Sequence, residues 1–303
     1  MKIINNFTEI ANNYDYFIFD IWGVVHDGSH LYPGILEILK FLRSNQKKIC
    51  FLSNAPRRKI KVEEVLNRFG ISRDFYDFVL TSGECSYDEL KKNQENNYSH
   101  YGKNYFYIGP NKDLNLLDGL NYSKTDKIEN AHFVITTGFD NDDSNIDEKL
   151  PLAFLAKKHN LTMICVNPDL IVVKQNGSEM ICAGALALEY EKIGGKVDYF
   201  GKPYSKVYEM TLEKFGISKK DKILAIGDGI LTDIKGANDF KIDNLLVCSG
   251  ILSNEIQNAK QENIDNKINQ VLNSYNIFPK YLILKLSLWN YIQESPKKIL
   301  LKF

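Results

Sequence analysis

Short apolar runs that end abruptly in an acidic residue recur along the chain. Residues 16–19 lead directly to Asp20, and residues 223–226 lead to Asp228. An unbroken apolar run of this length is typical of a parallel strand buried on both faces, and open α/β sheets bind ligands at the carboxyl ends of such strands. The pattern therefore places Asp20 where chemistry would occur, although an aspartate that only opens a turn before Gly23 fits this stretch equally well.

Helical periodicity separates these runs. Apolar side chains recur at Ile35, Ile38, Leu39 and Leu42, after Pro33-Gly34 and before a second apolar run over residues 47–54. A strand, a helix and a strand with such short connections predict a parallel pair joined by a right-handed crossover. A second helical stripe over residues 62–69 ends at Gly70, and further strands are expected at 245–248 and 281–284, with a helical tail over 253–276.

The pattern of apolar and polar residues changes from about residue 81. Residues 91–103 are polar and rich in asparagine, which predicts a surface excursion. New strands are then expected at 105–108, 132–135 and 161–166, together with helices near 152–156 and from Ser178 to Ile193, where Gly194-Gly195 ends the last one. The core pattern resumes around Val197.

These patterns predict an α/β fold with two parts. Residues 1–80 and 197–303 form a discontinuous parallel-sheet core, and residues 81–196 form an inserted α/β cap. At 303 residues the chain is long enough for both parts to bury an interior.

Composition narrows the classes of partner. Lys+Arg 38 against Asp+Glu 38 leaves no net charge to attract nucleic acid or an anionic membrane. The five cysteines are odd in number and lack a C-x-x-C pair, so we expect buried thiols and neither disulfides nor a zinc site. The amino terminus lacks the apolar region of a signal peptide and no run approaches a membrane span. We expect a cytoplasmic protein. Nothing in the composition argues against a homo-oligomer.

The polar ends of the predicted strands and helices form one chemical set. Its members are Asp20, Ser53 with Asn54, Lys202 at a helix start, and Asp228 with Asp233. A carboxylate that attacks a phosphate meets an anion, so it needs a divalent metal, a fixed cation and small hydrogen-bond donors. Asp228 and Asp233 would hold Mg²⁺ through hard oxygens. Lys202 would offset the charge of Asp20, and Ser53 would donate to a phosphate oxygen.

In this order the segments resemble the motifs of the haloacid dehalogenase-like hydrolases. Phe17-Ile18-Phe19-Asp20 is similar to the first motif of that family, Phe51-Leu52-Ser53-Asn54 to the second, Gly201-Lys202-Pro203 to the third, and residues 227–233 to the fourth. Val166-Asn167-Pro168-Asp169 looks like the cap of the class IIA branch, whose members are small-molecule phosphatases. The resemblance spans nearly the whole chain and implies a Rossmann-like core, Mg²⁺ dependence and an aspartyl-phosphate intermediate.

One position departs from the family pattern. The family's phosphatases carry a second aspartate two residues after the nucleophile, where it transfers protons, and this chain has Trp22 there. Tryptophan cannot transfer a proton, and loss of such a group costs about 10²–10⁴-fold in rate. Either the leaving group needs little protonation, or another group such as His26 or Asp27 substitutes, or the site binds without turnover. His26 and Asp27 could equally only cap or line their loop.

Other interpretations of single motifs are weaker. Gly227-x-Gly229 lacks the third glycine of a dinucleotide-binding loop, and Gly28 argues against a helix that aims His26 and His30 at a metal. A genuine dehalogenase lacks the Mg²⁺ requirement, whereas this chain keeps both Asp228 and Asp233.

Two further pairs of residues beside the motifs have open roles. Arg57 and Arg58 either reach a substrate or form a solvated helix start. Asn167 and Asp169 either line the cap face of the cleft or only form a turn.

Together these features predict an enzyme. We expect a Mg²⁺-dependent phosphohydrolase of a small phosphorylated metabolite, with Asp20 and Lys202 catalytic and with Ser53 and Asn54 binding the phosphate. Mg²⁺ is expected on Asp20, Asp228, Asp233 and the main-chain carbonyl of Trp22, with waters completing its coordination. The alternative is a catalytically impaired member of the family that binds a phosphate ligand or regulates.

Overall fold

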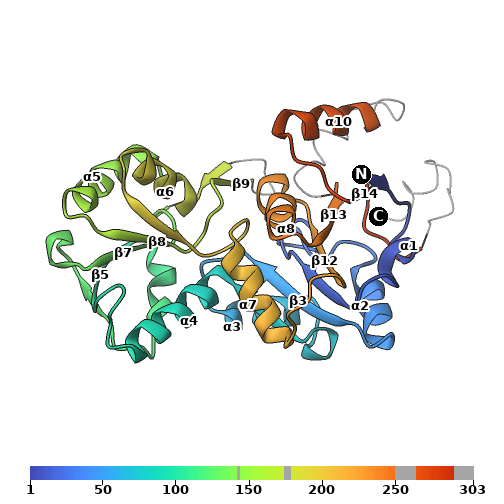
Figure 1. Ribbon diagram of the computed structural model, residues 1–303, viewed down its shortest axis with the longest axis horizontal. Coiled ribbons are helices and arrows are strands. Elements are labelled where there is room, and N and C mark those ends of the chain that lie inside the picture. Colours follow the sequence, from blue (N-terminus) through green and yellow to red (C-terminus); the bar gives the residue numbers. More distant parts are fainter. Residues whose placement is uncertain (142–143, 174–178, 250–263, 290–303) are drawn as a thin grey trace.

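The computed structural model describes residues 1–141, 144–173, 179–249 and 264–289. Within these residues, strands form a seven-stranded sheet at one end of an elongated molecule and a five-stranded sheet at the other (Figure 1). Helices α4 and α7 lie between the two sheets and contact each other.

The seven-stranded sheet is parallel throughout. Across it, the strands are β1 (Lys2–Ile3), β14 (Tyr281–Ile283), β13 (Asp243–Val247), β12 (Ile223–Gly227), β2 (Tyr16–Phe19), β3 (Lys48–Ser53) and β4 (Phe78–Thr81). The apolar runs of β2, β3 and β12 occupy the centre, where both faces are covered. A continuous apolar sequence is what such a position requires, because neither face meets water.

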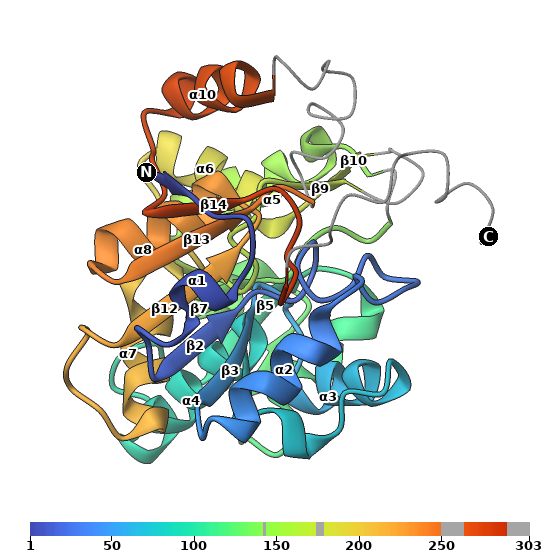
Figure 2. The same ribbon diagram turned by 90° about the vertical axis from the view of Figure 1, so that its right-hand side faces the viewer.

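Helices cover both faces of this sheet, as the turned view shows (Figure 2). They are α1 (Thr8–Ala11), α2 (Ile35–Ser44), α3 (Lys59–Arg68), α7 (Ser205–Phe215) and α8 (Lys235–Phe240), with α10 (Ile264–Tyr275) at the β13 and β14 side. The predicted stripe of α2 is buried at Ile35, Ile38, Leu39 and Leu42. Helix α2 therefore packs through the face that the sequence periodicity indicated.

The five-stranded sheet is also parallel. Its strand order is β11 (Lys196–Tyr199), β8 (Thr162–Cys165), β7 (Phe133–Thr136), β5 (Asn104–Ile108) and β6 (Ser123–Thr125). Helices α5 (Leu150–Lys158) and α6 (Ala183–Lys192) pack together on it. An antiparallel hairpin of β9 (Ile171–Val173) and β10 (Glu179–Ile181) precedes α6.

Short helical turns and one long helix complete the described chain. The turns are η1 (Arg73–Phe75), η2 (Asn111–Leu117), η3 (Ile128–Asn130), η4 (Ile146–Glu148) and η5 (Ile230–Ile234), and the long helix is α4 (Ser82–Glu95). The α/β class and the parallel-sheet core predicted from the sequence are confirmed.

Three sequence expectations differ from the structure. Residues 82–95, where no helix was expected, form α4, which buries Cys85 and Leu90 and includes the first residues of the predicted polar stretch 91–103. The helix expected from Ser178 begins at Ala183, because residues 179–181 form strand β10. Residues 253–263 of the predicted helical tail, and Gly177 with Ser178, lie outside the described residues.

The third difference concerns the boundary of the predicted core. Residues 197–199 were expected to re-enter the core, but they belong to β11, which pairs with β8 in the five-stranded sheet. A short strand of this composition fits the edge of either sheet. Which sheet it joins depends only on its pairing partner, here β8. The division into a core and an inserted cap stays a prediction, with its second crossing now placed after Tyr199.

Candidate active site

Three neighbouring strands deliver polar side chains to one edge of the seven-stranded sheet. In the order β12, β2 and β3, these strands end at Asp228, Asp20 and Ser53. Because the strands are parallel, their carboxyl ends meet at the same edge. Lys202 reaches this edge from the connection between β11 and α7.

The edge holds a buried cluster of three carboxylates and one ammonium group. Oxygens of Asp20, Asp228 and Asp233 lie within 4.8 Å of one another, and all three residues are buried. Lys202 Nζ donates to Asp20 Oδ1 and, over 2.7 Å, to Asp233 Oδ1. The lysine balances only part of the negative charge, which leaves an excess that a divalent cation would neutralise.

Burial and charge oppose each other in this cluster. Burial raises the pKa of Asp20 well above its usual range, the ammonium of Lys202 lowers it, and Asp233 and Asp228 raise it further. For Lys202, burial lowers the pKa, but the carboxylates of Asp20 and Asp233 raise it more, so the net shift is upward. Lys202 is therefore a permanent cation beside Asp20.

Asp233 is held by the turn that follows β12. Its Oδ2 accepts hydrogen bonds from the Gly229 amide at 3.1 Å and the Thr232 hydroxyl at 3.5 Å, while its Oδ1 accepts from Lys202. A Cβ on Gly227 would lie 2.1 Å from Asp233 Cγ, so only glycine fits there. Both oxygens of Asp233 thus have protein donors, which suits a residue that orients Lys202 and the cluster.

The loop after Asp20 passes directly over Asp228. Gly23 has φ +84°, and a Cβ there would lie 2.1 Å from Asp228 Oδ2. This close approach of backbone to carboxylate requires glycine. It brings the main chain next to Trp22 toward the same carboxylates. A set of hard carboxylate oxygens such as this one fits Mg²⁺.

Trp22 directly precedes Gly23 and is partly exposed to solvent. The residue is 46% exposed, and its ring meets His26 edge-on at a centroid distance of 5.6 Å. A Cβ on Gly28 would lie 2.5 Å from the indole, so the ring rests on this glycine. The position carries no group that transfers a proton.

His26 and Asp27 bind the backbone of their own loop. His26 Nδ1 accepts from the Gly28 amide at 2.9 Å, and its ring stacks on Phe69 at 4.8 Å. Burial lowers the pKa of His26, although Asp27 raises it. Asp27 Oδ1 accepts from the amides of Ser29 and His30. These contacts are those of a loop-forming pair, and a proton-transfer role for either residue stays a prediction.

Asn54 joins three segments of the chain through one side-chain amide. Its Nδ2 donates to Asp169 Oδ1 and to the Lys202 carbonyl, both at 2.9 Å, and its Oδ1 accepts from the Lys202 amide at 2.7 Å. Asn167 Oδ1 accepts from the Asp169 amide at 3.1 Å, which shapes that turn. The Asn54 side chain thus positions Lys202, and its predicted contact with the phosphate stays a prediction.

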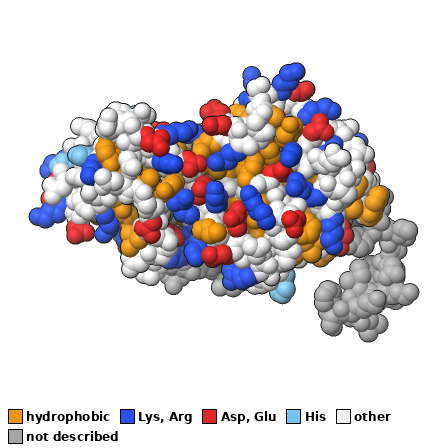
Figure 3. All heavy atoms as spheres, turned by 90° about the horizontal axis from the view of Figure 1, so that it is seen from below, with side chains coloured by type: hydrophobic (Ala, Val, Ile, Leu, Met, Phe, Trp, Pro, Cys, Tyr) orange, Lys and Arg blue, Asp and Glu red, His pale blue; other side chains and the backbone are white. Residues whose placement is uncertain are grey.

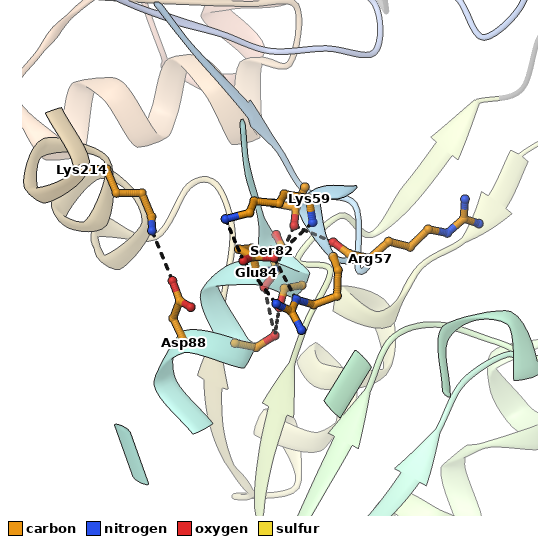
Figure 4. Close-up of polar contacts among 10 residues, drawn as sticks. Arg57, Lys59, Ser82, Glu84, Asp88 and Lys214 are labelled. Carbon is orange, nitrogen blue, oxygen red and sulfur yellow. Dashed lines mark hydrogen bonds and ion pairs between the residues drawn. The ribbon is translucent and has the colours of Figure 1, made fainter. Parts of the chain in front are cut away.

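Arg57 and Arg58 both pair with buried carboxylates. Arg57 Nε lies 3.1 Å from Asp113 Oδ1 in η2, and Arg58 Nε lies 2.8 Å from Glu84 Oε2 at the start of α4. Figure 4 shows Lys59 beside Glu84, while Arg57 extends away from that group. Neither arginine is merely a solvated helix start. The buried partners could not be identified from sequence, because both acids lie in polar stretches.

The surface shows no segregation of charge on the face drawn in Figure 3, where basic and acidic side chains are interspersed. This agrees with the balanced composition. Among the described residues, no helix is long and apolar enough to cross a membrane.

Two family models match the chain. The model described as haloacid dehalogenase-like hydrolase matches residues 17–123, and one described as HAD-hydrolase-like matches residues 199–274. The matched segments contain all four residues of the buried cluster. The chain belongs to the haloacid dehalogenase-like hydrolase family.

Named relatives and one solved structure are similar to this chain over most of its length. It is 23% identical over 253 residues to the acid sugar phosphatase of Staphylococcus epidermidis, covering 82% of this chain and 92% of that protein. It is 26% identical over 238 residues to the ribonucleotide monophosphatase NagD of Escherichia coli, covering 78% and 88%. A hydrolase structure from Brucella suis, of the haloacid dehalogenase-like family, matches with a TM-score of 0.77 at 29% identity, covering 93% of this chain and 99% of that one.

Within the family, the chain is a class IIA member, as its sequence indicated. The prediction of a phosphatase-type hydrolase is confirmed at the level of the family, whose relatives are named for sugar and nucleotide phosphates.

Proposed function

We propose that this protein hydrolyses small organic phosphates through an aspartyl-phosphate on Asp20, with Mg²⁺ as cofactor. The observation that carries the proposal is the buried cluster at the sheet edge, in which Lys202 bridges Asp20 and Asp233 beside Asp228. Burying three carboxylates around one ammonium is costly for stability. Such an arrangement is typical of a functional site rather than of a structural core.

The reaction has two displacements. A carboxylate oxygen of Asp20 attacks phosphorus, and the bond from phosphorus to the leaving oxygen breaks, with the electron pair going to that oxygen. Water then attacks phosphorus, the bond to Asp20 breaks, and the carboxylate is regenerated. Lys202 offsets the negative charge that gathers in both steps. The Ser53 hydroxyl oxygen accepts from the Ala55 amide at 3.2 Å, and its own hydrogen would donate to a phosphate oxygen.

Asp20, Asp228 and the Trp22 carbonyl would hold Mg²⁺, and Asp233 would orient the cluster. When bound, the cation supplies charge neutralisation for the attacking carboxylate and the phosphate. The excess of carboxylates over ammonium groups supports this assignment.

A second candidate is a family member that binds a phosphate ligand with little turnover. Trp22 favours it, because the residue two positions after Asp20 offers no proton to a departing alkoxide. The retained Lys202 and Asp228 favour the enzyme. A protein that only binds a ligand would not need a nucleophile with a neighbouring cation and metal-binding carboxylate.

Steady-state and burst kinetics on acetyl phosphate, p-nitrophenyl phosphate and glucose 6-phosphate, with and without Mg²⁺, separate these candidates. We expect Mg²⁺-dependent turnover in the order of leaving-group acidity, with the sugar phosphate slower by about 10²-fold or more, the effect of a missing proton donor. Asp20→Asn should abolish turnover of all three substrates. Trp22→Asp should raise turnover of the sugar phosphate.

Three outcomes would contradict the proposal. If Asp20→Asn is as active as wild type, the reaction does not pass through an aspartyl-phosphate on Asp20. If calorimetry gives the same Mg²⁺ affinity for Asp228→Ala and wild type, Asp228 is not a ligand. Stoichiometric phosphate binding without turnover in any variant would favour the regulatory candidate.

A further inference from the structure

Trp22 is a fixed aromatic side chain two residues after Asp20, and the next residue, Gly23, lies against Asp228. Its ring is held from one side by Gly28 and edge-on by His26, yet the residue remains 46% exposed. His26 is itself fixed by the Gly28 amide and by stacking on Phe69. An exposed indole whose orientation is set by its neighbours is preorganised to stack on a ligand, because little conformational entropy is lost on binding.

Two more exposed apolar side chains lie close in the sequence to residues of the site. Leu231, in the turn between Asp228 and Asp233, is 45% exposed, and Leu170, directly after Asp169, is 44% exposed. Leu231 lies two residues before Asp233, and Leu170 follows Asp169, which accepts a hydrogen bond from Asn54. Exposed large apolar side chains beside a charged cluster indicate contact with an apolar part of a ligand.

The lack of a proton donor at Trp22 also favours a substrate with an apolar leaving group. Without a proton donor, the leaving oxygen must depart as a stable anion. An oxygen attached directly to an aromatic ring forms such an anion, since the ring delocalises its charge, and that flat ring can stack on an indole. The missing proton donor and the added stacking surface are thus two consequences of one residue.

We propose that Trp22 is a specificity-determining residue that selects aryl phosphates by stacking on the aromatic leaving group. The proposal rests on the phosphohydrolase function proposed above and names its substrate class.

Kinetics of side-chain variants test the stacking. For 1-naphthyl phosphate, we expect Trp22→Leu to raise KM about tenfold and Trp22→Phe about threefold, the range of an aromatic pair, with kcat changed less. For acetyl phosphate, which has no ring, KM should stay within about twofold, the limit set by lost apolar contact alone. Trp289→Leu is the matched control, because Trp289 is the other tryptophan of the chain and is 64% exposed.

Fluorescence provides a readout that does not depend on turnover. In a Trp289→Phe background, Trp22 is the remaining tryptophan, and phenylphosphonate should change its emission while methylphosphonate should not. Emission that responds equally to both phosphonates, or to neither, would overturn the proposal.

The outcomes also separate this inference from the proposed function. If Asp20→Asn is inactive but Trp22→Leu raises KM equally for acetyl and naphthyl phosphate, only the stacking role fails. If Asp20→Asn retains full activity, the phosphohydrolase mechanism itself fails.

Discussion

Two fully buried tyrosines differ in what their hydroxyl groups contact. Tyr190 donates to the Leu161 carbonyl at 2.6 Å. Tyr208 has no hydrogen-bond partner among the described residues, and it packs so closely on Gly236 that a Cβ there would lie 2.5 Å from its hydroxyl oxygen. A buried hydroxyl without a partner loses its hydration and gains nothing in return.

Tyr208→Phe should therefore stabilise the protein. We expect the free energy of unfolding to rise by about 1 kcal/mol, the cost of an unpaired buried polar group. Urea unfolding measures it. Tyr190→Phe is the matched control and should lower the same free energy by about 1 kcal/mol, because it removes the hydrogen bond to the Leu161 carbonyl. Equal destabilisation by both variants would show that the Tyr208 hydroxyl has a partner such as an ordered water.

At the scale of elements, Glu84 fastens the start of α4 to the segment that follows β3. Its carboxylate pairs with Arg58 at 2.8 Å and Lys59 at 3.4 Å, and Thr81 caps the helix by accepting from the Glu84 amide. Arg58 also lies over the Tyr87 ring, 3.3 Å from its centroid. Burial raises the pKa of Glu84, but the hydrogen bonds and charges of Arg58 and Lys59 lower it more, so the net shift is downward.

This shift gives a stability that depends on pH. Between the folded pKa and the unfolded value near 4.5, the unfolded chain binds more protons, so stability falls as pH falls through that window. Glu84→Gln should lower the free energy of unfolding at pH 7 by about 1–3 kcal/mol, the range for hydrogen bonds to charged groups.

The variant should also lose less stability than wild type between pH 7 and pH 3.5, because its side chain does not titrate. Urea unfolding at both pH values measures this. Glu64→Gln removes the exposed pair with Lys61 and should change stability by less than about 0.5 kcal/mol. A Glu84→Gln variant that loses as much stability in acid as wild type would contradict the assignment.

At the scale of the molecule, one apolar cluster spans both sheets. It contains Leu52 of the seven-stranded sheet and Phe133 of the five-stranded one, with Leu90 of α4 among its members. Helix α4 contacts both α7 and η2. The Arg57–Asp113 and Asn54–Asp169 contacts add polar links between the same two parts. The two sheets are thus packed as one body and should unfold together.

Leu90→Ala tests this continuity. The fully buried side chain leaves a cavity, so we expect a loss of about 2–5 kcal/mol and a single calorimetric transition at a lower temperature. Leu188→Ala, at a residue 38% exposed on α6, is the control and should cost less than about 0.5 kcal/mol. Two separated transitions in either variant would show that the sheets unfold independently.

Much of the fold and of the candidate site could be predicted from the sequence. Apolar runs ending at Asp20, Ser53 and Asp228 are local patterns, and the parallel-strand geometry they imply brings their ends together, as observed. The roles of these residues in catalysis remain proposals. Trp22 as a missing proton donor was also evident, since it depends only on residue type.

The tertiary structure alone decided how polar side chains are partnered. The sheet joined by β11, the engagement of Asn54 with Lys202 and Asp169, and the burial of Glu84 all depend on segments far apart in the sequence. Local periodicity carries no information about such partners, because an amide or a carboxylate in a polar stretch looks the same whether it meets water or a distant cation. Local chemistry thus determined where strands end, and long-range packing determined what each strand end meets.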